Sequence, residues 1–279
     1  MRARTPVIMK AHQLLVACIA WLMAAPADSA SKSPEQINVD GSTWHPRLLI
    51  VEDFTDPEWR NRWAIEGRGT AEIEGGRLQI LAPGGSGGVT VWLRKQLPPN
   101  VLVECRAGSN QTSQSNATNL NLVLHAREPD GAPYQFGRSG KYSEYKRFPN
   151  YIFTLTGDFE GQPGHARLRR NPGFALMNGD PTLGALVGHS YHLRVLILDG
   201  RLRYWVDGRL IHNARDEHPL LGGHFGLRTW KSEVWWSDLK IYRLDLVNGS
   251  GNSSQNRLES DELIDSDLQT PHFAQHLRW

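Results

Sequence analysis

Strand-length apolar runs follow one another along most of this chain, from residue 47 to residue 246. Most runs alternate apolar and polar residues, and Gly, Pro, Asn or Asp separates each run from the next. Asp199-Gly200 and Asp207-Gly208 lie between such runs, and these dipeptides are typical of tight β-hairpin turns. No segment keeps a helical period over ten residues. The pattern therefore predicts an all-β protein, a jelly-roll β-sandwich of two packed antiparallel sheets.

The first thirty residues have the pattern of a secretory signal peptide. Basic residues precede an apolar run over 14–25, and the small residues 25–27 form a cleavage site. The run is too short to span a bilayer, and no transmembrane segment is predicted. We therefore expect an exported protein, periplasmic or extracellular. Cys18 follows a Leu-Val-Ala sequence that resembles a lipobox, so lipoprotein anchoring through this cysteine is the alternative.

Composition divides the rest of the chain into four parts. Residues 31–43 form an N-terminal segment, and the β-sandwich is expected over 44–246. Residues 247–260 are rich in Gly, Ser and Asn and predict a flexible linker, and 261–279 form an acidic C-terminal tail.

Cysteine content argues against an internal disulfide, and net charge argues against a nucleic-acid-binding protein. The chain has 2 cysteines. Once the signal peptide is removed only Cys105 remains, so no internal disulfide is expected. The net charge of +2 lacks the strong basic excess of a dedicated nucleic-acid binder.

Functional side chains crowd together between residues 138 and 174. Tyr and Arg side chains brought together in this way are suited to gripping hydroxylated or carboxylated ligands. In the strands expected around 119–127 and 165–171, alternation places polar residues on one face. Sugar rings stack on aromatic side chains and their hydroxyls need fixed polar partners, so we expect a polysaccharide or oligosaccharide ligand. The candidate binding residues are Asn119, Asn121, Arg138, Lys146, Asn150, Tyr151, Arg167, Arg169, Arg228 and Trp230.

No motif predicts a metal or cofactor requirement. The sequence has no zinc-ligand spacing, no Gly-rich phosphate loop and no nucleophile elbow. Asp53 and Asp238 fall in the expected first and last strands and carry the oxygen ligands that a structural Ca²⁺ uses, although their spacing is nonspecific.

Four blocks of this sequence resemble the secreted bacterial family DUF1961. They are R-x-G-x-Y-x-E-Y at 138–145, N-Y-I at 150–152, R-x-R-R-N-P-G-F at 167–174 and the closing block at 222–244. The resemblance covers nearly all of 44–246. It implies a concanavalin A-like (lectin/glucanase) jelly roll and a glycan context, but it implies no particular reaction.

Cleavage of an acidic polysaccharide by a metal-independent lyase is the favoured hypothesis. Tyr142 or Tyr145 would be the general base and acid, with His125 as partner. The substrate carboxylate would be held by Arg138, Arg167, Arg169 and Asn121. We also expect the ligand on the concave face of the jelly roll, in one groove lined by Arg138, Tyr142, Tyr145, Asn150, Arg167 and Arg169.

Three alternatives stay open. A glycoside hydrolase would use Glu144, but a retaining enzyme needs two carboxylates about 5 Å apart, and no second acid shares this segment. The E-x-D-x-E motif of glucanases with this fold is also missing. A noncatalytic glycan-binding module needs only the aromatic and cationic groups. A structural envelope protein would expose its polar face to solvent without binding a ligand there.

Overall fold

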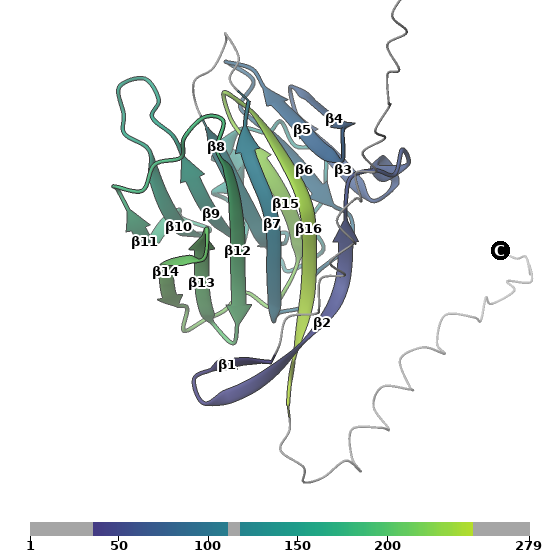
Figure 1. The fold of residues 1–279 in the computed structure, drawn as a ribbon. Helices are drawn as coiled ribbons and strands as arrows, with labels where there is room; N and C mark the ends of the chain where they lie inside the picture. Colours follow the sequence, from purple (N-terminus) through teal and green to yellow (C-terminus); the bar gives the residue numbers. More distant parts are fainter. Residues whose placement is uncertain (1–35, 111–117, 248–279) are drawn as a thin grey trace, which may run out of the picture. The chain divides into compact units, whose positions relative to one another are not determined.

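The computed structural model describes residues 36–110 and 118–247 as two antiparallel β-sheets (Figure 1). The expected signal peptide with Cys18, the acidic tail and nearly all of the expected linker lie outside these residues. Strand pairing begins at Ile37, before the expected start of the sandwich at residue 44. None of the described helices is long and apolar enough to cross a membrane.

The first sheet has nine strands within the described residues, in the order β1-β2-β16-β7-β12-β13-β14, with β5 also pairing β16 and β4 pairing β5. Its members are β1 (Ile37–Val39), β2 (Ser42–Glu52), β4 (Thr70–Glu74), β5 (Arg77–Ala82), β7 (Val101–Ser109), β12 (Ser190–Leu198), β13 (Arg201–Val206), β14 (Arg209–Arg215) and β16 (Ser232–Leu246). The Asp199-Gly200 and Asp207-Gly208 dipeptides join β12, β13 and β14, and all four residues have positive φ, which confirms these two predicted turns.

The second sheet has seven described strands in the order β11-β10-β9-β8-β15-β6-β3. They are β3 (Trp63–Gly67), β6 (Val89–Leu93), β8 (Asn119–Ala126), β9 (Asn150–Thr156), β10 (His165–Asn171), β11 (Ala175–Asp180) and β15 (His224–Thr229). Short helices occur at η1 (Trp59–Asn61) and α1 (Tyr142–Tyr145). The predicted all-β fold of two antiparallel sheets is therefore confirmed.

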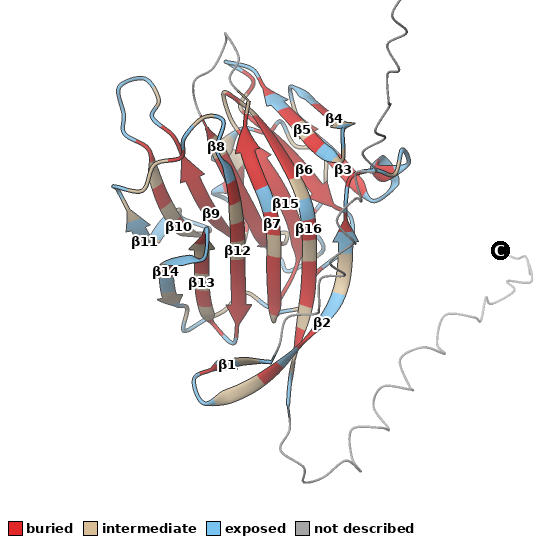
Figure 2. Ribbon diagram, in the orientation of Figure 1, coloured by how far each residue is buried: buried red, intermediate tan, exposed pale blue. Residues whose placement is uncertain are grey.

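The main core lies between the sheets and is built by alternation along the strands (Figure 2). In β8, Leu120, Leu122 and Leu124 enter this core, while Asn119 and Asn121 point to the outer face of the second sheet. Burying these apolar faces supplies the main driving force for folding.

Alternation in β8 ends at His125. This residue has φ +57°, and the pairing of β8 with β15 shifts register between His224 and Gly226. The result is a local irregularity that turns His125 away from the face that carries Asn119 and Asn121.

A second, smaller core covers part of the outer face of the second sheet. Residues 127–149 join β8 to β9 and fold back over this face, and we call this segment the plug. Its side chains Tyr134, Tyr145 and Phe148 pack on Trp92, Val123, Ile152 and neighbouring residues of the strands. The Trp92 and Tyr145 rings are stacked, with centroids 6.0 Å apart. The plug therefore occupies part of a face that would otherwise be open.

A buried carboxylate holds the plug in place. Glu66 of β3 accepts hydrogen bonds from the Tyr134 hydroxyl at 2.9 Å, the Tyr145 hydroxyl at 2.5 Å and the Gly137 amide at 3.2 Å. The Tyr145 hydroxyl also lies 2.8 Å from that of Thr90. Burial, followed by the negative charge of Glu66, raises the pKa of Tyr145 far above its ordinary range, so this phenol stays protonated.

Three glycines let the plug cross the sheet edge at close range. A Cβ on Gly140 would lie 2.4 Å from the carbonyl oxygen of Gly88 and 2.7 Å from the Cα of Gly67. Gly140 also has φ +78°, which favours glycine. Only hydrogen atoms fit between these backbones.

We expect Gly140→Ala to lower the free energy of unfolding by about 2–4 kcal/mol, because the methyl group adds a backbone clash to the strain of positive φ. Gly131→Ala is the matched control, since Gly131 lies in the same segment with φ +86° and has nothing within 4 Å of the added Cβ. Urea unfolding of both variants checks the difference. Equal losses would contradict the close crossing.

Candidate functional site

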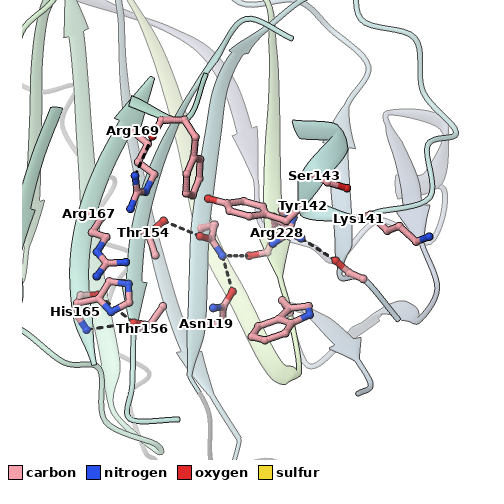
Figure 3. Close-up of a pocket in the computed structure, with 14 residues that line it drawn as sticks. Asn119, Lys141, Tyr142, Ser143, Thr154, Thr156, His165, Arg167, Arg169 and Arg228 are labelled. Atoms are coloured by element: carbon pink, nitrogen blue, oxygen red, sulfur yellow. Dashed lines mark hydrogen bonds between the residues drawn. The ribbon is translucent and has the colours of Figure 1, made fainter. Parts of the chain in front are cut away.

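A pocket of about 440 Å³ opens on the outer face of the second sheet, beside the plug (Figure 3). Strands β8, β9, β10 and β15 form its floor, and the plug, the turn after β10 and the residue after β15 form its walls. It is lined by Gly87, Asn119, Asn121, Lys141, Tyr142, Ser143, Thr154, Thr156, His165, Arg167, Arg169, Phe174, Arg228 and Trp230.

Cross-strand pairing fixes the floor. Arg167 faces Thr154, Thr154 faces Asn121, and Asn121 faces Arg228, so one row of polar residues crosses four strands. The Thr154 hydroxyl donates to Asn121 Oδ1 at 2.8 Å. Asn121 Nδ2 donates to Asn119 Oδ1 at 2.6 Å and to the Arg228 carbonyl at 3.3 Å. The amide groups are therefore held in one orientation before any ligand arrives.

Arg228 ties the floor to the wall. Its guanidinium group is buried and donates to the carbonyl oxygens of Gly87 at 2.9 Å and Gly140 at 3.2 Å. It also lies over the rings of Tyr142 and Tyr145, 4.7 and 5.1 Å from their centroids. Burial lowers the pKa of Arg228 from its ordinary value, but an arginine of this kind remains charged at neutral pH.

Two more arginines project from β10. Arg169 donates to the Phe174 carbonyl at 3.0 Å and stacks on the Phe174 ring at 3.9 Å. Within the described part of the chain, neither Arg167 nor Arg169 pairs with a carboxylate, and no Asp or Glu lines the pocket. Burial, and then the positive charge of Arg167, lowers the pKa of His165, so this imidazole is neutral at pH 7. The pocket is thus strongly cationic.

Tyr142 stands opposite these arginines. Figure 3 shows its hydroxyl directed across the pocket toward the strands that carry Thr154, Arg167 and Arg169. The ring packs edge-on against Phe174, with centroids 5.2 Å apart. Burial raises the pKa of Tyr142, while the nearby guanidinium groups oppose this rise. The phenol is therefore protonated in the free protein.

The structure brings only part of the expected site together. Seven of the expected residues line the pocket: Asn119, Asn121, Tyr142, Arg167, Arg169, Arg228 and Trp230. The expectation of one groove shared by six residues holds for Tyr142, Arg167 and Arg169 and is wrong for Arg138, Tyr145 and Asn150.

Two of the expected catalytic residues are buried away from the pocket. Tyr145 is occupied by Glu66 and Thr90 under the plug. His125 is turned aside by the irregularity in β8, and its Nδ1 lies 3.1 Å from the Leu220 carbonyl. Burial lowers the pKa of His125 to about 4. Neither side chain can reach a ligand in this conformation.

Others of the expected residues have structural partners. Arg138 pairs with Glu128 and lies over both the Tyr134 and Phe148 rings, 4.7 Å from each centroid. Buried Asn150 donates to the Tyr145 and Phe148 carbonyls at 2.9 and 2.8 Å and so holds the end of the plug.

The last three expected residues lie outside the pocket lining. The Tyr151 hydroxyl donates to Asp216 at 2.6 Å. Glu144 accepts from the Ser139 amide at 3.0 Å. Lys146 lies over Phe174, with Nζ 4.1 Å from the ring centroid.

Several lining residues were not expected from the sequence. Thr154, Thr156 and His165 have the same alternation as their neighbours and could have been found by extending the period-two pattern along β9 and β10. Lys141 directly precedes the short helix α1, Ser143 lies in it, Phe174 lies in the turn after β10, and none of them carries such a signal. Among the described residues, no group of three or more His, Cys, Asp or Glu side chains is placed to hold a metal ion. The Ca²⁺ site at Asp53 and Asp238 stays a prediction.

Fold and site together define a lectin-like β-sandwich with a polar pocket on the outer face of one sheet. The chain belongs to the family described as "Domain of unknown function (DUF6250)", whose model matches residues 85–239, more than half of the chain. The expected membership of DUF1961 is therefore wrong. No curated protein matches this chain.

Solved structures with this fold include proteins of different kinds. A protein of unknown function with a galectin-like fold from Bacillus subtilis has a TM-score of 0.59 and 14% identity over 72% of this chain and 98% of its own. The exoplasmic/lumenal domain of VIP36, in a Ca²⁺/Man3GlcNAc-bound form, has a TM-score of 0.52 and 14% identity over 78% and 95%. An endo-beta-1,3-glucanase from Pyrococcus furiosus has a TM-score of 0.50 and 14% identity over 77% and 100%. At this identity the likeness shows the fold alone.

Proposed function

We propose that this protein binds an anionic saccharide in the pocket beside the plug. The observation that carries the proposal is the convergence of Arg167, Arg169 and Arg228 on a pocket whose described lining contains no acidic side chain. Guanidinium groups bind carboxylate and sulfate groups through charge-assisted hydrogen bonds. An exported protein, as expected from residues 1–30, would meet such saccharides.

The remaining lining residues favour a sugar over a small inorganic anion. Asn119, Asn121 and Thr154 present amide and hydroxyl groups in fixed orientations, and Trp230 offers a face for a sugar ring. The galectin-like and VIP36 folds support this reading as analogy. The described pocket lining has no pair of carboxylates for hydrolysis, so binding is proposed ahead of a hydrolase.

Affinity electrophoresis against a panel of polysaccharides tests the proposal. The panel contains polygalacturonate, alginate, hyaluronan and chondroitin sulfate, with laminarin and xylan as neutral comparisons. We expect retention by acidic members only, weakening as salt is added. Hyaluronan against chondroitin sulfate separates carboxylate from sulfate recognition. Equal retention by laminarin, or none by any acidic member, would overturn the proposal.

Cleavage by β-elimination is a second candidate, favoured by the position of Tyr142. Tyr142 would first lose its own proton to solvent, with the phenolate stabilised by the Arg228 guanidinium over its ring. The phenolate would then take the C5 proton of a uronate whose carboxylate is held by Arg167 and Arg169. The C4–O bond would then break as the C4=C5 double bond forms, and the Tyr142 hydroxyl would return its proton to the leaving oxygen.

Tyr142→Phe separates this candidate from binding alone. The substitution keeps the ring and its packing on Phe174, so affinity should stay within about threefold, while cleavage should fall by about 100-fold or more. Ultraviolet absorbance of the unsaturated product and titration calorimetry measure the two effects. If the wild-type protein releases no unsaturated product from a glycan that it binds, cleavage is excluded for that glycan and the binding proposal stands.

A further inference from the structure

We propose that the pocket receives the end of an acidic glycan chain and that the following sugars lie over Trp230 and Phe159. This inference rests on the proposed function and specifies which part of the glycan is recognised.

The plug closes one side of the binding face. The polar row that begins at Arg167 continues past Arg228 to Thr90 of β6 and Glu66 of β3. It therefore crosses six strands, but its last two residues are buried and bonded to Tyr145. A glycan that lies across the sheet can follow the row over four strands and then meets the wall formed by the plug.

The wall is firmly attached. The Gly67, Gly88 and Gly140 backbones are in close contact there, and Arg228 donates to the Gly140 carbonyl from below. Beyond the wall, Trp92, Val123 and Ile152 are fully buried under the plug, so no groove continues on that part of the face. An internal segment of a polysaccharide needs a path on both sides of the bound sugar, whereas a chain end needs only one.

A second hollow supplies that path. It has a volume of about 480 Å³ and shares Asn119, Thr156, His165 and Trp230 with the pocket. Phe159 and Trp230 meet edge to face there, with ring centroids 5.6 Å apart. These rings offer the apolar contact on which pyranose faces stack.

Charge differs between the pocket and the second hollow. No Arg or Lys is among the described lining of the second hollow. Among the described residues, the one cation over its rings is Lys231, whose Nζ lies 5.0 and 4.7 Å from the Phe159 and Trp230 centroids. This ammonium group pairs with Glu160 of the lining at 2.9 Å. Arginine is therefore concentrated at the closed end, and aromatic surface lies next to it. This order fits an acidic terminal sugar followed by sugars that are recognised through their ring faces.

Counting proteins per glycan chain tests the inference. The probes are hyaluronan and oligogalacturonate fragments of two to ten sugars and the long polymers, studied by titration calorimetry and sedimentation. For whichever probe is bound, we expect one protein per chain at every length, and an affinity per chain that stops rising after a few sugars. Several proteins on one long polymer would overturn chain-end recognition while leaving anionic saccharide binding intact. No binding of any acidic member of the full polysaccharide panel would reject the proposed function as well.

Trp230→Ala tests the direction of the chain. We expect affinity for a tetrasaccharide to fall at least tenfold, and affinity for free galacturonate or glucuronate to fall by a smaller factor, because Trp230 also lines the pocket. Trp205→Ala is the matched control, because Trp205 packs in the first sheet and lines neither hollow. An unchanged tetrasaccharide affinity, or an equal loss for the monosaccharide, would overturn the path over Trp230.

Discussion

Replacing Glu66 with glutamine is expected to lower the free energy of unfolding by about 2–4 kcal/mol and to weaken ligand binding with it. The carboxylate accepts hydrogen bonds from Tyr134, Tyr145 and Gly137 in a buried network. Glutamine keeps the size of the side chain, but its amide NH₂ would face hydroxyl and amide donors. At least one buried donor would lose its partner, and the plug that forms the pocket wall would lose its anchor.

Glu128→Gln is the control for this result. Glu128 pairs with Arg138 in the same segment and is less buried than Glu66, so Glu128→Gln should cost less stability than Glu66→Gln. Urea unfolding measures stability, and titration with the bound glycan measures affinity. Wild-type stability in Glu66→Gln would mean that the plug does not depend on the buried carboxylate.

The double variant Arg167→Ala, Arg169→Ala is expected to lower affinity for an acidic glycan by at least 100-fold. Each charge-assisted hydrogen bond to a carboxylate contributes about 1.5–3 kcal/mol, and the two arginines project into one pocket. The remaining affinity should also depend less on salt, because two of the pocket charges are gone. Titration calorimetry at two salt concentrations measures both effects.

Arg203→Ala, Arg209→Ala makes the same change in net charge on the first sheet and serves as the control. Arg203 of β13 and Arg209 of β14 line neither hollow on the second sheet. We expect the control to bind within about twofold of the wild-type protein. A similar loss of affinity in both double variants would show that overall charge, rather than the pocket, attracts the ligand.

Local pattern was enough to predict the strands and which side chains share a face. The period-two rule placed Asn119 with Asn121, and Arg167 with Arg169, on the outer face of one sheet, where all four line the pocket. The rule says nothing about which strands are neighbours. Asn121 meets Arg228 because β8 pairs with β15, about a hundred residues away along the chain, and such nonlocal pairing has no local sequence signal.

The failures in the site come from burial. The sequence predicts that Arg138, Tyr142 and Tyr145 contact the ligand, because phenols and guanidinium groups need polar partners. Most found those partners inside the protein: Tyr145 bonds Glu66, and Arg138 pairs with Glu128. Glu66 lies about eighty residues before Tyr145, in a short strand, so no local pattern connects the two. The predicted position of His125 differs from the structure because His125 itself has positive φ and ends the alternation of β8.

Crowding of positive charge in the pocket has a consequence for the folded state itself. Burial, and then the positive charge of Arg167, lowers the pKa of Arg169. The two cations therefore repel each other in the empty protein. Folding must hold these charges together without a compensating carboxylate in the described pocket. An anion that enters the pocket relieves this repulsion, so the melting temperature should rise with occupancy. Sulfate or phosphate in a buffer would then stabilise the protein before any saccharide is added, and the residues that make the pocket useful are also those that keep the free protein below its greatest stability.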